Sequence, residues 1–489
     1  MTATMSLDPL TCATDMLAAM RAGSLTSGEI VEALLERIDR CDGALNAFVT
    51  VDAEGARRQA AVADAERADG RLRGALHGLP ITLKDCFATA GLRTTAGQQE
   101  TVEHVPEQDA VVVARLRAAG AIVLGKTNLP AGVSGQETAN VIVGRTANPW
   151  DPSRTPGGSS GGSAVAVATG MSPLEVGSDS GGSIRQPCHN CGIYGHVATH
   201  GLVPQRGHLP SVPVDDVGAV QDLFSVGPMA RHPSDLALAL DLLVGADPVG
   251  PLAWQVNLPA STVPRDDVAG VRVAVVIGDP ACSISAEVRG CLGAAADALT
   301  AAGARVVEAW PPFDVAHAMD VAFKLWVATN ASDDDGSGGG ADQLSVMRSE
   351  ALRMSHGDWL DLDTERRRLS REWMRLLTDQ VDVLLCPVSP VTALRHDPDP
   401  SRVDEVGHRL ERRIDVDGTD APYLDQIRWN VLTGMAGLPA TAVPLGLADG
   451  GLPVGAQVVA APHRDRTTLA FAEALGNVVG GFRPPPGYA

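Results

Sequence analysis

Residues 155–163 read TPGGSSGGS and residues 177–185 read GSDSGGSIR, and these two stretches decide the interpretation of the chain. Both place serines among glycines, and a run of small, mostly apolar residues lies between them. Glycine permits positive φ angles and a close approach of the main chain to a ligand, so two such stretches can form two walls of one pocket. The pattern predicts a catalytic site built from loops, in which one serine attacks the substrate.

The composition is typical of a globular protein with a large core. The chain has 489 residues, 45% of them hydrophobic and 20% charged. No apolar run approaches the roughly 20 residues of a membrane helix, so we expect no membrane partner. The amino terminus has neither the basic segment nor the apolar segment of a secretory signal, and we expect a cytoplasmic protein.

Charge and cysteine usage narrow the function classes. The formal net charge is −20, from 39 basic and 59 acidic residues, which disfavours direct binding of nucleic acid. The eight cysteines are scattered along the chain, and we predict free thiols rather than disulfides.

Lysine is almost absent from the chain. Among the 39 basic residues, only Lys84, Lys126 and Lys324 are lysines. A buried lysine can lose its proton, whereas an arginine in a protein cannot. Lys84 lies in the sequence ITLKD between the apolar residues Leu83 and Phe87, which makes it a candidate base.

Periodicity predicts alternating helices and strands. Apolar residues recur on one face of residues 27–40, with Ser27 as a candidate N-cap, and residues 53–68 form a second helix before Gly70. Further strands are predicted over 81–83, 121–124, 271–277 and 381–385, and further helices over 109–118 and 163–169. The alternation indicates an α/β sandwich. The acidic, glycine-rich residues 332–340 are predicted to form a flexible surface loop.

Other serine chemistries fit less well. Residues 157–161 match the G-x-S-x-G elbow, which would make Ser159 the nucleophile, but a proline-broken loop precedes them rather than a strand. The sequence at Asp179 and Ser180 is similar to the serine motif of trypsin. The chain does not show the pattern of short strands expected for the paired barrels of that fold. A serine–lysine S-x-x-K dyad is excluded, because the positions three before the lysines hold Ile81, Val123 and Val321.

A metal site is also disfavoured. Cys188 and Cys191 form one C-x-x-C, and His196 and His200 lie four residues apart. Zinc sites need a second ligand pair at a defined spacing. We predict no metal and no other cofactor.

In chain order, Lys84, Ser159 and Ser183 resemble the amidase signature family, closely over residues 75–230 and more loosely elsewhere. The resemblance rests on HGLPITLKD (77–85), GLRTTAG (91–97), GKTN (125–128), PGGSSGGS (156–163), GSDSGGSIRQP (177–187), NVLTGMAGLP (430–439) and GLPVGAQ (451–457). Motifs of this length in one order are far more specific than a single G-x-S-x-G.

The family resemblance implies the fold and the division of the chain. We expect a single large α/β/α sandwich with a mixed, twisted central sheet flanked by helices. Residues 1–70 would form an amino-terminal helical layer packed on the core, and residues 71–489 the amidase signature domain, the whole being one structural domain. A homodimer is a further expectation from the family.

The family resemblance also implies residue roles. Ser183 would be the nucleophile, and Ser159, which in the family follows a cis peptide, here Gly158–Ser159, would pass a proton to neutral Lys84. Main-chain amides would form the oxyanion hole at Ser180, Gly181, Gly182 and Ser183. We expect Ser160, Asp179 and Arg185 to stabilise these loops and not to react with the substrate. Lys126 would belong to the scaffold.

The implied function is hydrolysis of a small-molecule carboxamide to a carboxylic acid and ammonia or an amine, through an acyl-serine. Three alternatives stay open: the amidase subunit of a glutamine-dependent tRNA amidotransferase, an amine-accepting acyltransferase, and a non-catalytic binding subunit of the same fold. The hydrolysis itself is expected to need no metal and no nucleotide.

Substrate choice is expected to depend on segments that vary in the family. The chain reads GHVAT over residues 195–199 where the family has GLKPT. Residues 204–210 also diverge, which, with the carboxyl-terminal third, disfavours the amidotransferase subunit among the alternatives. Pocket walls are expected from residues 134–146, 206–224 and 320–375. Three tryptophans are candidates for an apolar pocket or for plain core: Trp326, Trp359 and Trp429.

Overall fold

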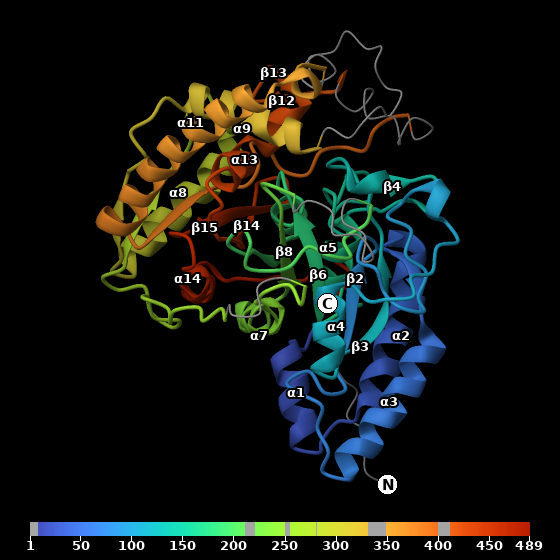
Figure 1. The fold of residues 1–489 in the computed structure, drawn as a ribbon. Helices are drawn as coiled ribbons and strands as arrows, with labels where there is room; N and C mark the ends of the chain where they lie inside the picture. The colour runs from blue at the N-terminus through green and yellow to red at the C-terminus, as the bar shows by residue number, and fades with distance from the viewer. Residues whose placement is uncertain (1–7, 211–220, 250–254, 280, 331–348, 400–410) are drawn as a thin grey trace.

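A single eleven-stranded sheet organises the computed structural model, which describes residues 8–210, 221–249, 255–279, 281–330, 349–399 and 411–489 (Figure 1). The sheet consists of β1 (Phe48–Val51), β2 (Pro80–Lys84), β3 (Ile122–Thr127), β6 (Leu174–Asp179), β7 (Tyr194–Val197), β8 (Ser225–Ala230), β9 (Arg272–Val275), β10 (Arg305–Val307), β11 (Val383–Pro387), β14 (Ala440–Leu447) and β15 (Pro453–Val459). Two separate hairpins pair β4 (Ala139–Asn140) with β5 (Gly144–Arg145) and β12 (Arg413–Val416) with β13 (Thr419–Pro422).

The sheet is mixed. Its spatial order is β1-β3-β2-β6-β8-β7-β14-β15-β11-β9-β10. Parallel pairing joins β3, β2 and β6 on one side and β11, β9 and β10 on the other, and the pairs between these groups are antiparallel. The predicted fold class, a mixed α/β sheet flanked by helices, is therefore confirmed.

Helices flank this sheet. They are α1 (Ala13–Arg21), α2 (Ser27–Leu45), α3 (Ala53–Ala68), α4 (Val111–Ala118), α5 (Gly161–Ala168), α6 (Arg185–Cys191), α7 (Pro233–Leu243), α8 (Ala286–Ala301), α9 (Val315–Asn330), α11 (His356–Arg375), α13 (Arg428–Gly434) and α14 (Asp465–Val479). The amino-terminal helices α1, α2 and α3 lie at one end of the molecule, and α8, α9 and α11 lie at the other (Figure 1). Among the described residues, no helix combines the length and the apolar character needed to span a bilayer.

The predicted elements are confirmed with small shifts in their ends. The helix predicted over residues 27–40 is α2, whose apolar face is buried and which continues to Leu45. Its N-cap is Thr26, not Ser27 as predicted, because Thr26 and Glu29 form a reciprocal capping box. The amino-terminal segment also contributes the strand β1, which the helical periodicity did not predict. The division of the chain at residue 70 stays a prediction, and the proposed loop over residues 332–340 lies outside the described residues.

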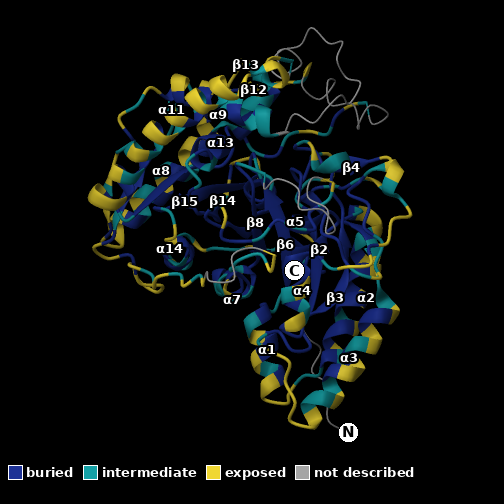
Figure 2. Ribbon diagram, viewed as in Figure 1, coloured by how far each residue is buried: buried dark blue, intermediate teal, exposed yellow. Residues whose placement is uncertain are grey.

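Every residue is buried in seven strands of the sheet, which are β2, β3, β6, β7, β8, β11 and β15 (Figure 2). The parallel strands β2, β3 and β6 begin with apolar residues and end in polar ones, with the sequences PITLK, IVLGKT and LEVGSD. The carboxyl ends of β2 and β6 lie side by side, since Leu83 pairs with Val176. Polar groups at the ends of these strands therefore meet at one edge of the sheet, where ligand sites of α/β proteins commonly lie.

Helix α5 is short, and all eight of its residues are buried. Its first turn touches main chain directly, because the Gly162 amide donates to the Asn128 carbonyl at 3.1 Å. A Cβ atom at Gly162 would lie 2.4 Å from the Asn128 nitrogen and 2.6 Å from the Ala47 oxygen. Only glycine fits here without a backbone shift.

We predict that Gly162→Ala lowers the free energy of unfolding by about 2 to 3 kcal/mol, because the clashing atoms belong to backbone that cannot rotate away. Gly290→Ala is the matched control, since a Cβ at Gly290 in α8 meets open space and alanine favours helix. Chemical denaturation of both variants measures the difference. Equal stability of the two variants would contradict the packing argument.

Candidate active site

Lys84 is the last residue of β2, and its side chain is completely buried. Its Nζ donates to Ser159 Oγ at 2.7 Å and to Ser178 Oγ at 3.0 Å. Within the described part of the chain, the hydrogen-bond partners of the amine are therefore two hydroxyl groups and no carboxylate.

Burial lowers the pKa of Lys84 from 10.5 to about 8, although Cys86, Asp179 and Glu175 act in the opposite direction. Removal of the amine from water disfavours its charged form. With this pKa, about one Lys84 in ten is uncharged at pH 7, against about 1 in 3,000 for an ordinary lysine. The structure thus gives Lys84 a substantial neutral population.

Glu175 lies on β6, the strand next to β2, and is itself buried. Burial raises the pKa of its carboxyl to about 8, against the lowering effect of hydrogen bonds from Thr82, Ser163 and Thr127. Glu175 is mostly uncharged at pH 7 and cannot hold Lys84 as a strong ion pair.

Ser159 follows a cis peptide bond, Gly158–Ser159, as the family resemblance predicted. Its neighbour Ser160 donates its backbone amide to the Ser183 carbonyl at 3.1 Å, which ties the two Gly/Ser stretches together. Ser183 is only half-buried, whereas Ser159 is fully buried. Within the described residues the Ser183 hydroxyl makes no hydrogen bond, so it is free to meet a ligand.

The loop after β6 is held by the buried carboxylate of Asp179. Its two oxygens accept hydrogen bonds from the backbone amides of Gly182 and Ile184 at 2.8 and 3.0 Å, and from the Arg185 guanidinium at 2.7 Å. Burial opposes ionisation, but Arg185 and these amides lower the pKa of the Asp179 carboxyl below its ordinary value. The carboxylate stays charged and fixes the loop.

The same arrangement bears on the oxyanion hole expected at Ser180, Gly181, Gly182 and Ser183, which stays a prediction. Because the Gly182 amide already donates to Asp179, the amides left as candidate donors are those of Ser180, Gly181 and Ser183. Gly182 has φ +104°, and a Cβ there would lie 2.6 Å from Asn430 Nδ2, so only glycine fits.

Arg185 links this loop to the carboxyl-terminal third of the chain. Its guanidinium also donates to the Asn430 carbonyl at 3.2 Å, to Thr433 Oγ1 at 2.8 Å and to Gln457 Oε1 at 2.9 Å. Asn430 and Gln457 belong to the two late motifs of the sequence. The tertiary structure therefore gathers motifs separated by about 250 residues around one buried guanidinium.

Two further residues of the site were not singled out in the sequence. Ser178 contacts Lys84, and its Oγ lies 3.0 Å from His208 Nε2. Ser178 sits inside the stretch GSDSGGSIR, and parallel pairing of β2 with β6 could have indicated it. His208 comes from the divergent loop over residues 204–210, and no local pattern pointed to it.

The remaining candidates have structural partners. Lys126 is buried and donates to the Phe87 carbonyl at 2.6 Å and to two threonine hydroxyls, with Asp85 3.6 Å away. His196 contacts Thr441 and Asp465 at 2.9 and 3.2 Å.

The four residues considered for a metal site do not form one in this structure. Among the described residues, no group of three or more histidine, cysteine or acidic side chains is arranged to hold a metal ion. All eight cysteines are free thiols, as predicted, and Cys188 and Cys191 are buried.

The three candidate tryptophans have different surroundings. Trp326 on α9 donates its Nε1 to Ser180 Oγ at 3.0 Å, and it would contact a Cβ at Gly181. It therefore borders the loop that carries Ser183. Trp429 is core, packed against Trp310 at a centroid distance of 5.7 Å. Trp359 stacks on His356.

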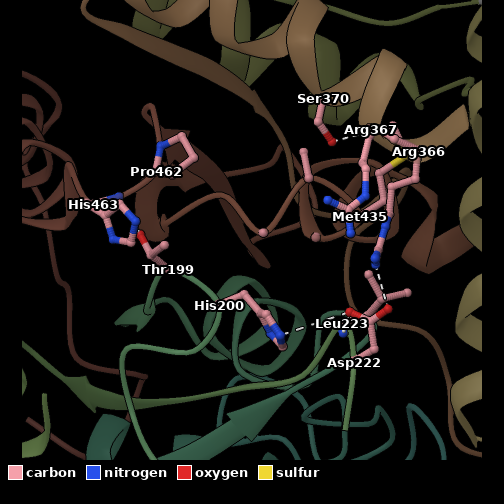
Figure 3. A pocket seen from close by; sticks show the side chains of 13 residues that line it. Thr199, His200, Asp222, Leu223, Arg366, Arg367, Ser370, Met435, Pro462 and His463 are labelled. Atoms are coloured by element: carbon pink, nitrogen blue, oxygen red, sulfur yellow. Dashed lines mark hydrogen bonds and ion pairs between the residues drawn. The ribbon is translucent and has the colours of Figure 1, made fainter. Parts of the chain in front are cut away.

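A cavity of about 330 Å³ opens elsewhere between α11, α13 and the loop after β7 (Figure 3). Three of its side chains are paired with one another: Arg366 donates to Asp222 at 2.6 Å, and His200 lies 4.0 Å from the same carboxylate. Arg367 pairs instead with Asp363, which does not line the cavity. It is lined by Thr199, His200, Asp222, Leu223, Arg366, Arg367, Ser370, residues 434–437, Pro462 and His463. None of the serines or lysines discussed above lines it.

A family model, related sequences and a solved structure all place this chain in the same family. The family model described as amidase matches residues 29–469. The glutamyl-tRNA(Gln) amidotransferase subunit of Roseiflexus sp. (strain RS-1) is 34% identical over 494 residues, covering 95% of each chain. The protein of the same name from Anaeromyxobacter sp. (strain K) is 34% identical over 505 residues, covering 96% of each chain. A solved structure described as an amidase superposes with a TM-score of 0.80 at 29% identity, covering 96% of this chain and 100% of that chain.

We predict that Asp179→Asn lowers the free energy of unfolding by about 3 kcal/mol or more, because it leaves the buried Arg185 guanidinium without its counter-charge. Asp420→Asn is the control, since its ion pair with Arg413 is exposed and such pairs contribute little. Thermal and urea unfolding compare the two variants. A loss for Asp179→Asn no larger than the loss for Asp420→Asn would contradict the bracing role.

Proposed function

This chain belongs to the amidase signature family, whose members are amidohydrolases acting on carbon–nitrogen bonds, and from that premise we propose that it hydrolyses a small-molecule carboxamide. The products are a carboxylic acid and ammonia or an amine, and the intermediate is an ester of Ser183. The observation that carries this proposal is the buried Lys84 amine, hydrogen-bonded to Ser159 and with a pKa of about 8.

In the proposed acylation step, the Ser183 oxygen attacks the carbonyl carbon of the amide. The Ser183 proton passes to Ser159 while the Ser159 proton passes to the lone pair of Lys84. Collapse of the tetrahedral intermediate breaks the carbon–nitrogen bond, and the proton returns through Ser159 to the leaving nitrogen. The 2.7 Å contact between Lys84 and Ser159 supports the second half of this relay.

The developing oxyanion would be stabilised by main-chain amides of Ser180, Gly181 and Ser183, which stand beside the fixed carboxylate of Asp179. Such donors act strongly because they are already oriented and partly shielded from water. In the deacylation step, water takes the place of the amine, loses a proton through Ser159 to Lys84, and releases the acid. No cofactor takes part in either step.

A second candidate function is the amidase subunit of a glutamine-dependent amidotransferase. The names of the relatives from Roseiflexus and Anaeromyxobacter favour it. In that case the amide would be glutamine, and the ammonia would be used by a partner protein. The chemistry at Ser183 would be the same, so substrate rather than mechanism separates the two functions.

A substrate screen tests the proposal. Wild-type protein is incubated with primary amides, anilides and glutamine, with hydroxylamine as a competing nucleophile, and mass spectrometry records acid, hydroxamate and acyl-Ser183. Acid from small amides supports the proposal, turnover of glutamine alone supports the amidotransferase function, and preferential hydroxamate indicates an acyltransferase. Absence of both turnover and fluorophosphonate labelling of Ser183 indicates a binding protein.

We predict that Ser183→Ala abolishes acyl-enzyme formation and that Lys84→Met lowers kcat/KM by about 10²- to 10⁴-fold, since the base is lost. Lys324→Met is the matched control, because Lys324 is an exposed lysine paired with Asp320 on α9. Circular dichroism and thermal unfolding confirm that each variant is folded. Full turnover by folded Lys84→Met would refute the proposed base.

We predict that kcat/KM rises about tenfold per pH unit below pH 8 and levels off above it. The sign follows because the uncharged amine is the active form: its population is complete above the pKa of Lys84 and lost below it. Glu175 has a raised pKa in the same range, so Glu175→Gln is measured alongside. We expect the rise of kcat/KM below pH 8 to persist in Glu175→Gln. If the rise disappears in that variant, the titrating group is Glu175 and not Lys84.

A further inference from the structure

We propose that His208 is a positioning residue, which accepts the hydroxyl hydrogen of Ser178 and so turns the lone pair of Lys84 towards Ser159. The inference rests on the proposed function, in which Lys84 is the base. It concerns a residue from the loop over 204–210, whose sequence diverges from the family.

His208 is buried beside the lysine. It is 1% exposed, and its Nε2 lies 3.0 Å from Ser178 Oγ, which itself accepts from Lys84 Nζ at 3.0 Å. Two phenylalanine rings pack against the imidazole in T-shaped contacts, with centroid distances of 5.4 Å to Phe87 and 4.6 Å to Phe224. Ser178 thus connects two buried nitrogen groups in a fixed geometry.

The number of hydrogens on each group determines the donor and the acceptor in the hydrogen bonds that join Lys84, Ser178 and His208. A neutral lysine has two N–H groups and one lone pair, and the proposed relay needs that lone pair for the Ser159 hydrogen. Lys84 must then donate an N–H group to Ser178, whose own hydrogen has to point elsewhere. The nearby ring nitrogen of His208 is the strong acceptor for it.

Without that acceptor, the Ser178 hydroxyl would be free to donate to the lone pair of Lys84 and would compete with Ser159 for it. Cys86 also lies close to Ser178, and burial raises the pKa of its thiol to about 11. Its protonated thiol is only a weak acceptor. His208 therefore sets the direction of the hydrogen bonds around Lys84.

The imidazole has to be uncharged for this role, because its Nε2 must carry a lone pair. Burial and the nearby Lys84 lower the pKa of His208 to about 3, so the ring stays neutral over the working pH range. Among the described residues, Cys86, Asp179 and Glu175 act on the charge of Lys84, and Lys84 in turn acts on His208.

The role also assigns the tautomer of His208. The ring hydrogen lies on Nδ1, which is buried and has no hydrogen-bond partner among the described residues. Leaving a buried polar group unpaired costs free energy. The ring accepts this cost at Nδ1 while its Nε2 contacts Ser178.

Two replacements separate hydrogen bonding from packing. His208→Phe keeps an aromatic ring between Phe87 and Phe224 but removes the acceptor, whereas His208→Gln loses the ring and keeps an acceptor near the position of Nε2. We expect the rate of fluorophosphonate labelling of Ser183 to fall about tenfold or more in His208→Phe and to be largely restored in His208→Gln. The opposite order would overturn the inference in favour of a packing role.

A double-mutant cycle tests whether His208 acts through Ser178. In a Ser178→Ala background, His208→Phe is expected to cause no further loss, because the hydroxyl that it orients is gone. If the fold-losses of the two single variants multiply in the double variant, the two residues act independently and the inference is overturned. Labelling is measured from pH 6 to 10, and we expect the loss in His208→Phe to persist above pH 9, where Lys84 is already neutral. Recovery to the wild-type rate at high pH would indicate instead that His208 acts only on the charge of Lys84.

Nitrogen NMR of histidine-labelled protein reads the tautomer directly, with His208→Phe identifying the signal. A protonated Nδ1 and an unprotonated Nε2 are expected, and a protonated Nε2 would overturn the inference. This measurement does not depend on turnover. Absence of Ser183 labelling in the wild type would contradict the proposed function, while the tautomer would still decide the position of the hydrogen in the His208–Ser178 contact.

Discussion

The burial of one amine among hydroxyl groups is the constraint on which the rest of the site depends. Lys84 has left water without gaining a carboxylate as a hydrogen-bond partner from the described parts of the chain, so its proton is held weakly. Burial also lowers the pKa of Lys126 on the neighbouring strand, but there Asp85, 3.6 Å away, acts in the opposite direction and a backbone carbonyl accepts a hydrogen bond. Two lysines side by side in one sheet thus have different partners, and only one of them contacts Ser159 and Ser178.

The charges next to Lys84 are compensated by ion pairing and hydrogen bonds. Asp179 and Arg185 form a buried pair whose remaining hydrogen-bonding capacity is used by loop amides and by groups from α13 and β15. Breaking such a network is costly, since each partner would be left charged in the interior. The loop that carries Ser183 is therefore anchored to the carboxyl-terminal third of the chain, although Ser183 itself is only half-buried.

Divergence from the family pattern also has a structural counterpart. Over residues 195–199, His196 and Thr199 bind Asp465 at the start of α14, which connects β7 to that helix. Over residues 204–210, His208 reaches the hydroxyl of Ser178 next to Lys84. His196 thus connects β7 to α14, and His208 takes part in the hydrogen bonds around the proposed base.

The sequence by itself determined the α/β class, most of the elements and the candidates Lys84, Ser159 and Ser183, because apolar periodicity and long motifs are local properties of the chain. It misplaced the cap of α2 by one residue and missed β1, whose four residues are strand only by pairing with β3. Only the tertiary structure decided that the Gly182 amide is occupied by Asp179 and that Ser178 and His208 adjoin the lysine. These contacts join residues from separate loops and strands, and their partners are fixed by sheet pairing and loop packing, which no local pattern encodes.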